Sequence, residues 1–243
     1  FWSKILDLPQ QYAVNAMVTP NLLGLCLFDE QGSGKTVMTI SAFDILKRDG
    51  QIDSMIVVCP KSMLSGWECD IKKFIPDRSI TIADGNQVER RNAALATKDI
   101  LVTNYEGVDS ILVTLTALSS KLKFLLVVDE SYFAKNSEAN RSRLLVKLRP
   151  YCKRCFVLCG TPAPNSPYDL INQFNIADNG FTFSAFSKSE NPDTDKDRIA
   201  MLLSERGTFV RRLKSDVLSK VPEKNFRIIK AIILMAFFDR KIY

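Results

Sequence analysis

The stretch Asn21 to Arg48, NLLGLCLFDEQGSGKTVMTISAFDILKR, combines three features in an order that decides the fold. Leu22 to Phe28 is an apolar run of strand length, and the turn Gly32-Ser33-Gly34 follows it. From Lys35 onward the apolar residues recur at helical spacing, which predicts an amphipathic helix. A strand, a glycine-bearing turn and a helix N-terminus together favour an anion site, because free backbone N–H groups and the helix dipole converge on one point.

The side chains that follow the glycines have defined roles in such a turn. Lys35 would reach the β- and γ-phosphates of a nucleotide, and the Thr36 hydroxyl would ligate Mg²⁺. The strict nucleotide-loop pattern has Gly where this chain has Asp29, and the letters GSGKT also occur at ordinary helix starts. The phosphate-binding prediction therefore depends on what the rest of the chain supplies.

The composition is typical of a globular protein. The chain has 243 residues, of which 46% are hydrophobic and 25% charged, which suits one large or two small domains. Its apolar runs are shorter than the roughly 20 residues needed to cross a bilayer. The sequence begins with Phe1 and shows no signal peptide, so we expect a fragment of a longer intracellular protein.

Positive charge is concentrated in the second half of the chain. Residues 1–120 carry 11 Lys and Arg against 14 Asp and Glu, whereas residues 121–243 carry 22 against 13. Basic side chains crowd residues 141–154 and 211–214. This distribution suits a polyanionic partner such as nucleic acid, although a basic run is also compatible with an ordinary solvated face.

The six cysteines argue against a structural zinc site. Cys152 and Cys155 have the spacing of a ligand pair, but a tetrahedral site needs four ligands, and the chain has no His. Cys26, Cys59 and Cys159 lie in apolar runs, where a free Cys behaves as a small buried hydrophobe. We expect a reducing compartment.

Strand-like and helix-like segments alternate from end to end. After the first strand and helix, strands are predicted at 54–59, 80–83, 100–103, 124–128 and 156–159. Helices are predicted at 62–74, 87–97, 108–118, 137–148 and 198–206, with an exposed loop at 187–197. Strands that are apolar on both faces and separated by helices indicate an α/β fold with a parallel sheet covered on both sides.

Polar motifs follow five of these strands. Ligands of parallel α/β sheets bind at the carboxyl ends of the strands, and the segments found there are 29–36, 60–62, 104–106, 129–132 and 160–162. Asp129-Glu130 follows the most apolar strand, where Asp129 would hold Mg²⁺ and Glu130 would orient and deprotonate an attacking water. A surface acidic pair is the alternative, but its combination with GSGKT favours a nucleotide hydrolase.

Taken in order, these motifs resemble the first motor lobe of the Swi/Snf-like family, superfamily 2 ATPases that translocate on double-stranded DNA. The resemblance runs from about Leu8 to Lys224, and the nucleotide loop of that family also has Asp at the position of Asp29. Pro9-Gln10-Gln11 resembles the motif that reads adenine, in which Gln11 aligns best. Arg211 to Lys224, RRLKSDVLSKVPEK, is close to a signature that this family carries after its first lobe.

The resemblance implies a three-layer RecA-like P-loop domain over residues 1–180 with a mostly parallel central sheet. A small helical insertion and the signature segment would occupy residues 181–243. It implies ATP and Mg²⁺ as cofactors, with ATP held by Gln11, Gly32, Ser33, Gly34, Lys35 and Thr36. It also implies that the DNA backbone is contacted by Lys61, Ser62, Asn104 and Tyr105.

The resemblance further implies a coupling segment. Gly160, Thr161 and Pro162 match the motif that couples ATP to DNA. Many relatives have His two residues after the catalytic Glu, where this chain has Tyr132. Because Tyr can still donate a hydrogen bond, we expect altered coupling rather than an inactive site.

The implied activity is DNA-stimulated ATP hydrolysis that moves the protein along duplex DNA and remodels proteins bound there. No sequence specificity is expected, because phosphate contacts carry no sequence information. The family's second RecA-like lobe carries arginine fingers, which contribute roughly 10³–10⁵ in rate, so the isolated lobe is expected to hydrolyse ATP poorly. We expect no membrane partner, and a cytoplasmic, nucleoid-associated location in a bacterial or viral setting or a nuclear one in a eukaryote.

Two alternatives remain open at this point. One is another superfamily 2 ATPase, such as a strand-separating helicase or a restriction-system motor, against which RRLKSDVLSKVPEK argues. The other is a non-hydrolysing DNA- or protein-binding module, against which the intact Lys35, Thr36 and Glu130 argue.

Overall fold

A seven-stranded sheet forms the centre of the protein, in a computed structural model that describes residues 1–213. The strands run in the order β3-β4-β2-β5-β6-β1-β7, and every neighbouring pair is parallel. Their bounds are Gly24–Leu27 (β1), Ser54–Cys59 (β2), Ile80–Ala83 (β3), Ile100–Asn104 (β4), Phe124–Asp129 (β5), Arg154–Leu158 (β6) and Phe209–Val210 (β7).

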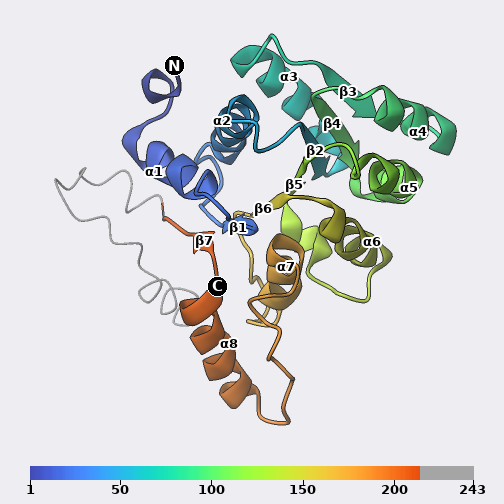
Figure 1. The fold of residues 1–243 in the computed structure, drawn as a ribbon. Coiled ribbons are helices and arrows are strands. Elements are labelled where there is room, and N and C mark those ends of the chain that lie inside the picture. Colours follow the sequence, from blue (N-terminus) through green and yellow to red (C-terminus); the bar gives the residue numbers. More distant parts are fainter. Residues whose placement is uncertain (214–243) are drawn as a thin grey trace.

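Helices cover both faces of this sheet (Figure 1). The bounds are Leu8–Met17 (α1), Lys35–Arg48 (α2), Leu64–Phe74 (α3), Gln87–Ala96 (α4), Val108–Leu118 (α5), Asn140–Leu148 (α6), Asp169–Asp178 (α7) and Pro192–Arg206 (α8). Helices α1, α2 and α3 share one hydrophobic core with the sheet, and α4 to α8 share the other. This is the three-layer α/β fold of RecA-like type that the sequence predicted.

The continuous apolar runs are explained by burial on both faces. All six residues of β2 and all six of β5 are buried. Because side chains alternate between the faces of a strand, Val57 and Val127 enter the core under α1 to α3, whereas Ile56 and Leu126 enter the opposite core. The register pairs Ile56 with Leu126 and Val57 with Val127, so the two central strands contribute matched layers to each core.

Several boundaries differ from the predictions. Helix α6 begins at Asn140 rather than at residue 137, because the Asn136 side chain accepts the backbone N–H of Glu138 and holds a turn there. Helix α8 begins at Pro192, inside the segment predicted to be a loop, because Asn191 caps its first turn. Helix α7 and strand β7 were not predicted from the sequence.

The described residues beyond position 180 pack onto the sheet. Ile199, Leu202 and Leu203 of α8 lie in the same core as Phe174 of α7, and β7 pairs with β1. Helix α8 extends below the sheet in Figure 1. Most of the signature segment, from 214 to 224, lies outside the described residues. Within residues 1–213, no helix combines the length and apolarity needed to cross a membrane.

Candidate nucleotide-binding site

The segment after β1 forms a tight turn that ends at the first residue of α2. Gly32 and Gly34 have φ values of 79° and 85°, in the left-handed region that favours glycine. A Cβ atom at Gly34 would also lie 2.5 Å from Nε2 of Gln10. No side chain caps this end of α2, so the first N–H groups of the helix remain available to an anion.

Lys35 closes over this turn, which we call the nucleotide loop (residues 29–36). Its Nζ donates to the carbonyl oxygens of Asp29 at 2.9 Å and Glu30 at 3.2 Å. Burial lowers the pKa of Lys35, and the negative charges of Glu130, Asp129 and Asp29 counteract that effect. The ammonium group therefore lies close to the carboxylates of Asp129 and Glu130. This is the placement expected of a lysine that binds a phosphate beside a metal ion.

Asp129 ends β5 as a buried, hydrogen-bonded carboxylate. Its Oδ1 accepts the backbone N–H of Glu130 at 2.9 Å, and its Oδ2 accepts the indole N–H of Trp67 at 2.9 Å. Burial raises the pKa of Asp129, whereas the hydrogen bond from Trp67, the Glu130 N–H and the charge of Lys35 lower it. Trp67 is buried in the core, and its contact with the acidic pair was not predicted from the sequence.

Glu130 adopts a strained backbone conformation beside this carboxylate. Its φ of 50° and ψ of 53° are left-handed, which costs free energy for a residue other than glycine and is commonly found at functional sites. Burial raises the pKa of the half-buried Glu130, the charge of Asp129 raises it further, and Lys35 lowers it. A raised pKa favours proton acceptance near neutral pH, so the environment of Glu130 suits a general base.

Residues 160–162, which we call the coupling loop after the role that the resemblance implies, follow β6 and approach the nucleotide loop. A Cβ atom at Gly160 would lie 2.8 Å from Cγ of Gln31 and 3.7 Å from Nζ of Lys35. The Arg211 guanidinium donates to the carbonyl oxygens of Gly160, at 2.8 Å, and of Phe28. The ends of β1 and β6 are therefore joined, whereas the side chain of Thr161 is exposed and Pro162 is buried.

Asp29, where the strict loop pattern has Gly, is held by the segment after β7. Its carboxylate is fully buried and pairs with the Arg212 guanidinium, which also donates to the carbonyl oxygen of Pro9. The backbone N–H of Arg212 donates to Oδ1 of Asp29 at 2.8 Å. These two residues lie 183 positions apart, so the pair could not be found from local sequence.

The structure separates the two glutamines of the adenine motif. Gln10 donates through Nε2 to the carbonyl oxygen of Ser33 at 3.1 Å and therefore contacts the nucleotide loop. Gln11, which the alignment favoured, instead donates to the carbonyl oxygens of Leu6 at 2.8 Å and Ser3 at 3.3 Å. In this structure Gln10 lies against the loop and Gln11 does not, because successive helical residues point in different directions.

Two of the four residues expected to contact DNA are buried in this structure. The Tyr105 side chain is 3% exposed, and its hydroxyl donates to the carbonyl oxygen of Asp129 at 2.7 Å. Asn104 is 4% exposed, and its amide bonds to the Gly107 N–H and to Glu106. Both side chains therefore bond within the protein: Tyr105 holds the strand end that carries the acidic pair, and Asn104 caps the turn after β4.

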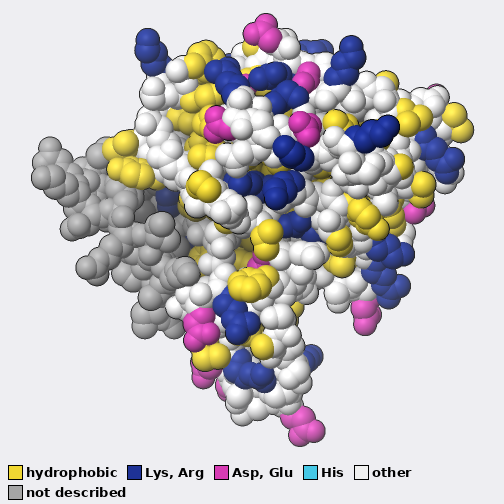
Figure 2. Space-filling view, viewed as in Figure 1, with side chains coloured by type: hydrophobic (Ala, Val, Ile, Leu, Met, Phe, Trp, Pro, Cys, Tyr) yellow, Lys and Arg dark blue, Asp and Glu magenta, His cyan; other side chains and the backbone are white. Residues whose placement is uncertain are grey.

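The other two expected DNA contacts lie at the surface. Lys61 and Ser62 follow β2 and are both exposed, and Lys61 makes one loose ion pair with Asp84 at 3.4 Å. Figure 2 shows Lys and Arg side chains spread over the visible face among apolar and acidic ones, rather than gathered into one stripe. Lys61 and Ser62 thus remain available to phosphate groups.

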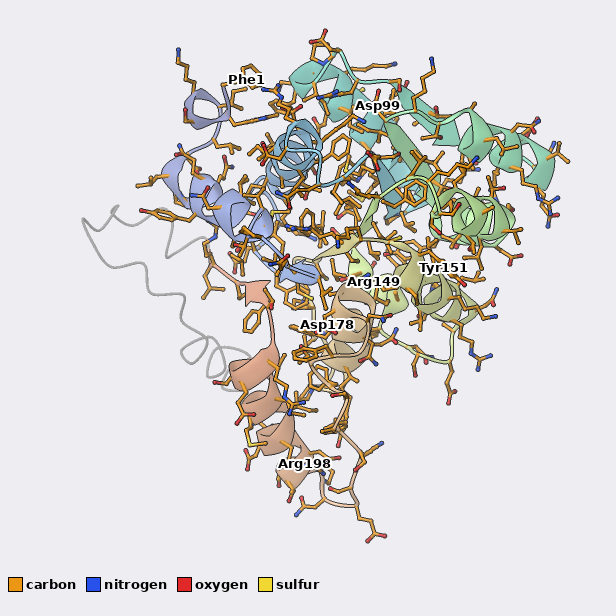
Figure 3. The ribbon with its side chains drawn as sticks, in the orientation of Figure 1. Phe1, Asp99, Arg149, Tyr151, Asp178 and Arg198 are labelled. Carbon is orange, nitrogen blue, oxygen red and sulfur yellow. The ribbon has the colours of Figure 1, made fainter. Side chains whose placement is uncertain are left out.

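Part of the basic stretch 141–154 proves to be structural. Arg149, labelled in Figure 3, is buried and donates to the carbonyl oxygens of Ala177, Cys152 and Leu23. Arg154 is also buried and donates to the carbonyl oxygens of Met17 and Thr19. These two guanidinium groups hold backbone segments together. Fewer basic side chains of residues 141–154 are therefore at the surface than the sequence suggested.

The polar groups at this site fit a nucleoside triphosphate with Mg²⁺. The Ser33 hydroxyl in the nucleotide loop is buried and has no hydrogen-bond partner within residues 1–213, which is unusual for a buried polar group. Thr36 lies in the first turn of α2, and Thr36 and Asp129 supply the oxygen ligands that Mg²⁺ prefers. Lys35, Ser33 and the uncapped helix would hold the phosphates.

The fold and this site define a class of protein. A parallel sheet with a glycine-bearing loop at the end of β1 and an acidic pair at the end of β5 is the arrangement of a P-loop nucleotide hydrolase. Both features lie at the carboxyl edge of the sheet, where ligands of α/β folds bind.

Comparison with known proteins narrows the class to a family. The model of the SNF2-related domain matches residues 10–243, and the chain belongs to this family as an N-terminal RecA-like lobe. It is 30% identical to the ISWI chromatin-remodeling complex ATPase ISW1 of Saccharomyces cerevisiae, over 90% of this chain and 20% of that protein. It is 29% identical to an uncharacterized ATP-dependent helicase of Mycoplasma genitalium, over 84% of this chain and 20% of that protein.

A solved structure gives the same assignment. The Sulfolobus solfataricus SWI2/SNF2 ATPase core in complex with dsDNA superposes with a TM-score of 0.71 at 26% identity, over 89% of this chain and 47% of that one. The chain thus spans about a fifth of the length of the two curated relatives and about half of the solved core.

Proposed function

We propose that this chain is the ATP-binding lobe of a DNA-stimulated ATPase that translocates on double-stranded DNA. The observation that carries the proposal is the meeting of Lys35, Asp129 and Glu130 at one edge of the sheet, with the coupling loop beside them. Bound Mg²⁺ would neutralise charge on the phosphates during transfer. Family membership and the DNA complex of the solved relative support the choice of duplex DNA.

Each residue has a role in the proposed reaction. Lys35, Ser33 and the N–H groups of α2 bind phosphate oxygens, and Thr36 and Asp129 hold the metal. Glu130 orients the attacking water and accepts its proton. Gln10 takes the adenine contact that the sequence assigned to Gln11, because it is the glutamine that lies against the nucleotide loop.

The DNA-binding surface is proposed to include Lys61 and Ser62, which contact the backbone without reading sequence. A second RecA-like lobe of the same protein is proposed to complete the site, and the isolated lobe is expected to bind ATP but turn it over slowly. The full protein would act at the nucleoid of a bacterium or in the nucleus of a eukaryote, on proteins bound to DNA.

The first test is ATP turnover by the full-length protein with and without duplex DNA, together with the Glu130→Gln variant. Stimulation by DNA that disappears in the variant supports both the motor and the base. ATP binding without DNA-stimulated turnover in the unmodified protein would contradict the proposal and favour a non-hydrolysing binding module. Lys61→Ala provides a separate readout, because losing one phosphate contact should reduce the salt dependence of DNA binding by about one unit of slope.

A further inference from the structure

One buried amide joins the acidic pair to the coupling loop. Gln173 lies in α7 and is fully buried. Its Oε1 accepts a hydrogen bond from the Ser131 hydroxyl at 2.6 Å. Its Nε2 donates to the carbonyl oxygens of Pro162 at 2.5 Å and Asp169 at 2.7 Å. Because Ser131 directly follows Glu130, a single side chain separates the proposed base from the coupling loop.

The orientation of this amide is fixed by its surroundings. The nitrogen of Gln173 faces two carbonyl oxygens, which can only accept, whereas its oxygen faces a hydroxyl, which can donate. The reverse orientation would place an oxygen against both carbonyl groups. All three bonds need the amide as it stands, so a carboxylate or an apolar side chain of similar size cannot replace it without leaving buried polar groups unpaired.

The side chain of Tyr132 does not provide this connection. Its side chain is 38% exposed, and its ring packs 4.3 Å from that of Phe133. No hydrogen bond of the Tyr132 hydroxyl is present within residues 1–213. The Cys159 thiol lies at the same junction: burial raises its pKa, and the backbone N–H groups of Thr161 and Tyr132 lower it.

We propose that Gln173 is the positioning residue that couples the acidic pair to the coupling loop in this chain. It takes the place of the contact expected from position 132. A shift of Ser131 on nucleotide binding is transmitted to Pro162, because both are bonded to the same amide and that amide is anchored on a helix. The coupling role rests on the proposed function. The hydrogen-bonded link between the two loops does not depend on it.

The first experiment measures ATP turnover by the full-length protein with duplex DNA, in Gln173→Leu and Gln173→Glu variants. We expect kcat with DNA to fall about tenfold, the size of effect that one or two lost hydrogen bonds can produce. The KM for ATP should stay within about twofold, because the hydrogen bonds of Gln173 go to Ser131, Pro162 and Asp169 rather than to the nucleotide loop. Unchanged DNA stimulation in both variants would overturn the proposal.

The neighbouring residue offers a matched control. Asn172 is a buried amide on the same helix, and its nitrogen donates to the carbonyl oxygen of Ala134. It therefore anchors the same 3₁₀ turn after Glu130 but makes no bond to the coupling loop within the described chain. Asn172→Leu should lower stability while preserving the ratio of DNA-stimulated to unstimulated turnover. An equal loss of that ratio would overturn a specific role for Gln173.

The second experiment separates this inference from the proposed function. Hydrogen exchange of the 243-residue chain is followed with and without ATP. In the unmodified chain, ATP should slow exchange in residues 129–134 and in residues 160–165; in Gln173→Leu it should slow exchange only in the first segment. This result, together with a lack of DNA stimulation, would reject the motor and retain the link. An equal response of residues 160–165 in both proteins, or none in the unmodified chain, would reject the link.

Discussion

The indole nitrogen of Trp67 donates a 2.9 Å hydrogen bond to Oδ2 of Asp129, across 62 positions of sequence. Helix α3 thereby holds the carboxylate that ends β5. The same hydrogen bond lowers the pKa of Asp129, against the burial that raises it. A side chain in the hydrophobic core thus helps to keep the proposed metal ligand ionised.

Trp67→Phe should weaken Mg²⁺-dependent ATP binding. Loss of a hydrogen bond to a charged group is worth about 1.5–3 kcal/mol, so the Mg²⁺ concentration for half-maximal ATP binding should rise about tenfold or more. A fluorescent ATP analogue titrated at several Mg²⁺ concentrations measures this effect on the 243-residue chain.

Trp2→Phe is the control for that experiment. Trp2 is also buried, and its indole nitrogen donates to Oδ2 of Asp44 at 3.0 Å. Both variants remove the same bond from a buried carboxylate, but Asp44 lies within α2, outside the nucleotide loop. A similar rise in the Mg²⁺ requirement in Trp2→Phe would show that the effect of Trp67→Phe is general destabilisation.

Gln10→Ala should reduce ATP affinity by about fivefold to tenfold, because one or two hydrogen bonds at the nucleotide loop are lost. Gln11→Ala removes bonds to the carbonyl oxygens of Ser3 and Leu6 and should leave ATP affinity nearly unchanged. Isothermal titration with ATP and with inorganic triphosphate separates an adenine contact from a loop contact. If Gln11→Ala alone loses affinity, and loses it for ATP but not for inorganic triphosphate, the adenine contact belongs to Gln11 as first assigned.

Glu130→Gln should stabilise the chain at neutral pH. The folded-state pKa of Glu130 is raised, mainly by burial, so ionisation of this carboxyl costs folding free energy above that pKa and nothing below the unfolded pKa. The melting temperature of the variant should therefore exceed that of the parent at pH 7.5, and the difference should vanish as the pH falls below about 4.

Glu138→Gln is the matched comparison for this pH experiment. Glu138 is exposed, and its substitution removes the same formal charge eight residues along the chain. A melting-temperature gain of equal size and pH dependence in Glu138→Gln would assign the effect to net charge and contradict a cost specific to the site.

Arg149→Leu should lower the free energy of unfolding by about 2–4 kcal/mol, because three backbone carbonyl oxygens each lose a hydrogen bond from the buried guanidinium. Urea denaturation measures the change. Arg143→Leu makes the same chemical substitution at an exposed position of α6 and should stay within about 0.5 kcal/mol of the parent. Equal effects of the two substitutions would contradict a structural role for the buried guanidinium.

The sequence by itself determined the layers of this protein and the edge of the sheet at which the proposed nucleotide site lies. Apolar runs of strand length and helical periodicity are local signals, and burial on both faces of β2 and β5 makes them strong. The site at the carboxyl edge followed from the parallel sheet, because that topology brings the residues after β1, β5 and β6 together. For the same reason Lys35, Asp129 and Glu130 could be expected to lie together at that edge before any coordinates.

Only the tertiary structure decided which side chains support that site. The pair of Asp29 with Arg212, the bond of Trp67 to Asp129 and the bridge through Gln173 join residues that lie 183, 62 and 42 positions apart. No local pattern encodes such contacts, because they depend on how separate elements pack. Burial of Tyr105 beneath the acidic pair, against the DNA contact expected from its motif, has the same origin: a motif gives the position of a residue at a strand end, and packing alone decides which way its side chain points.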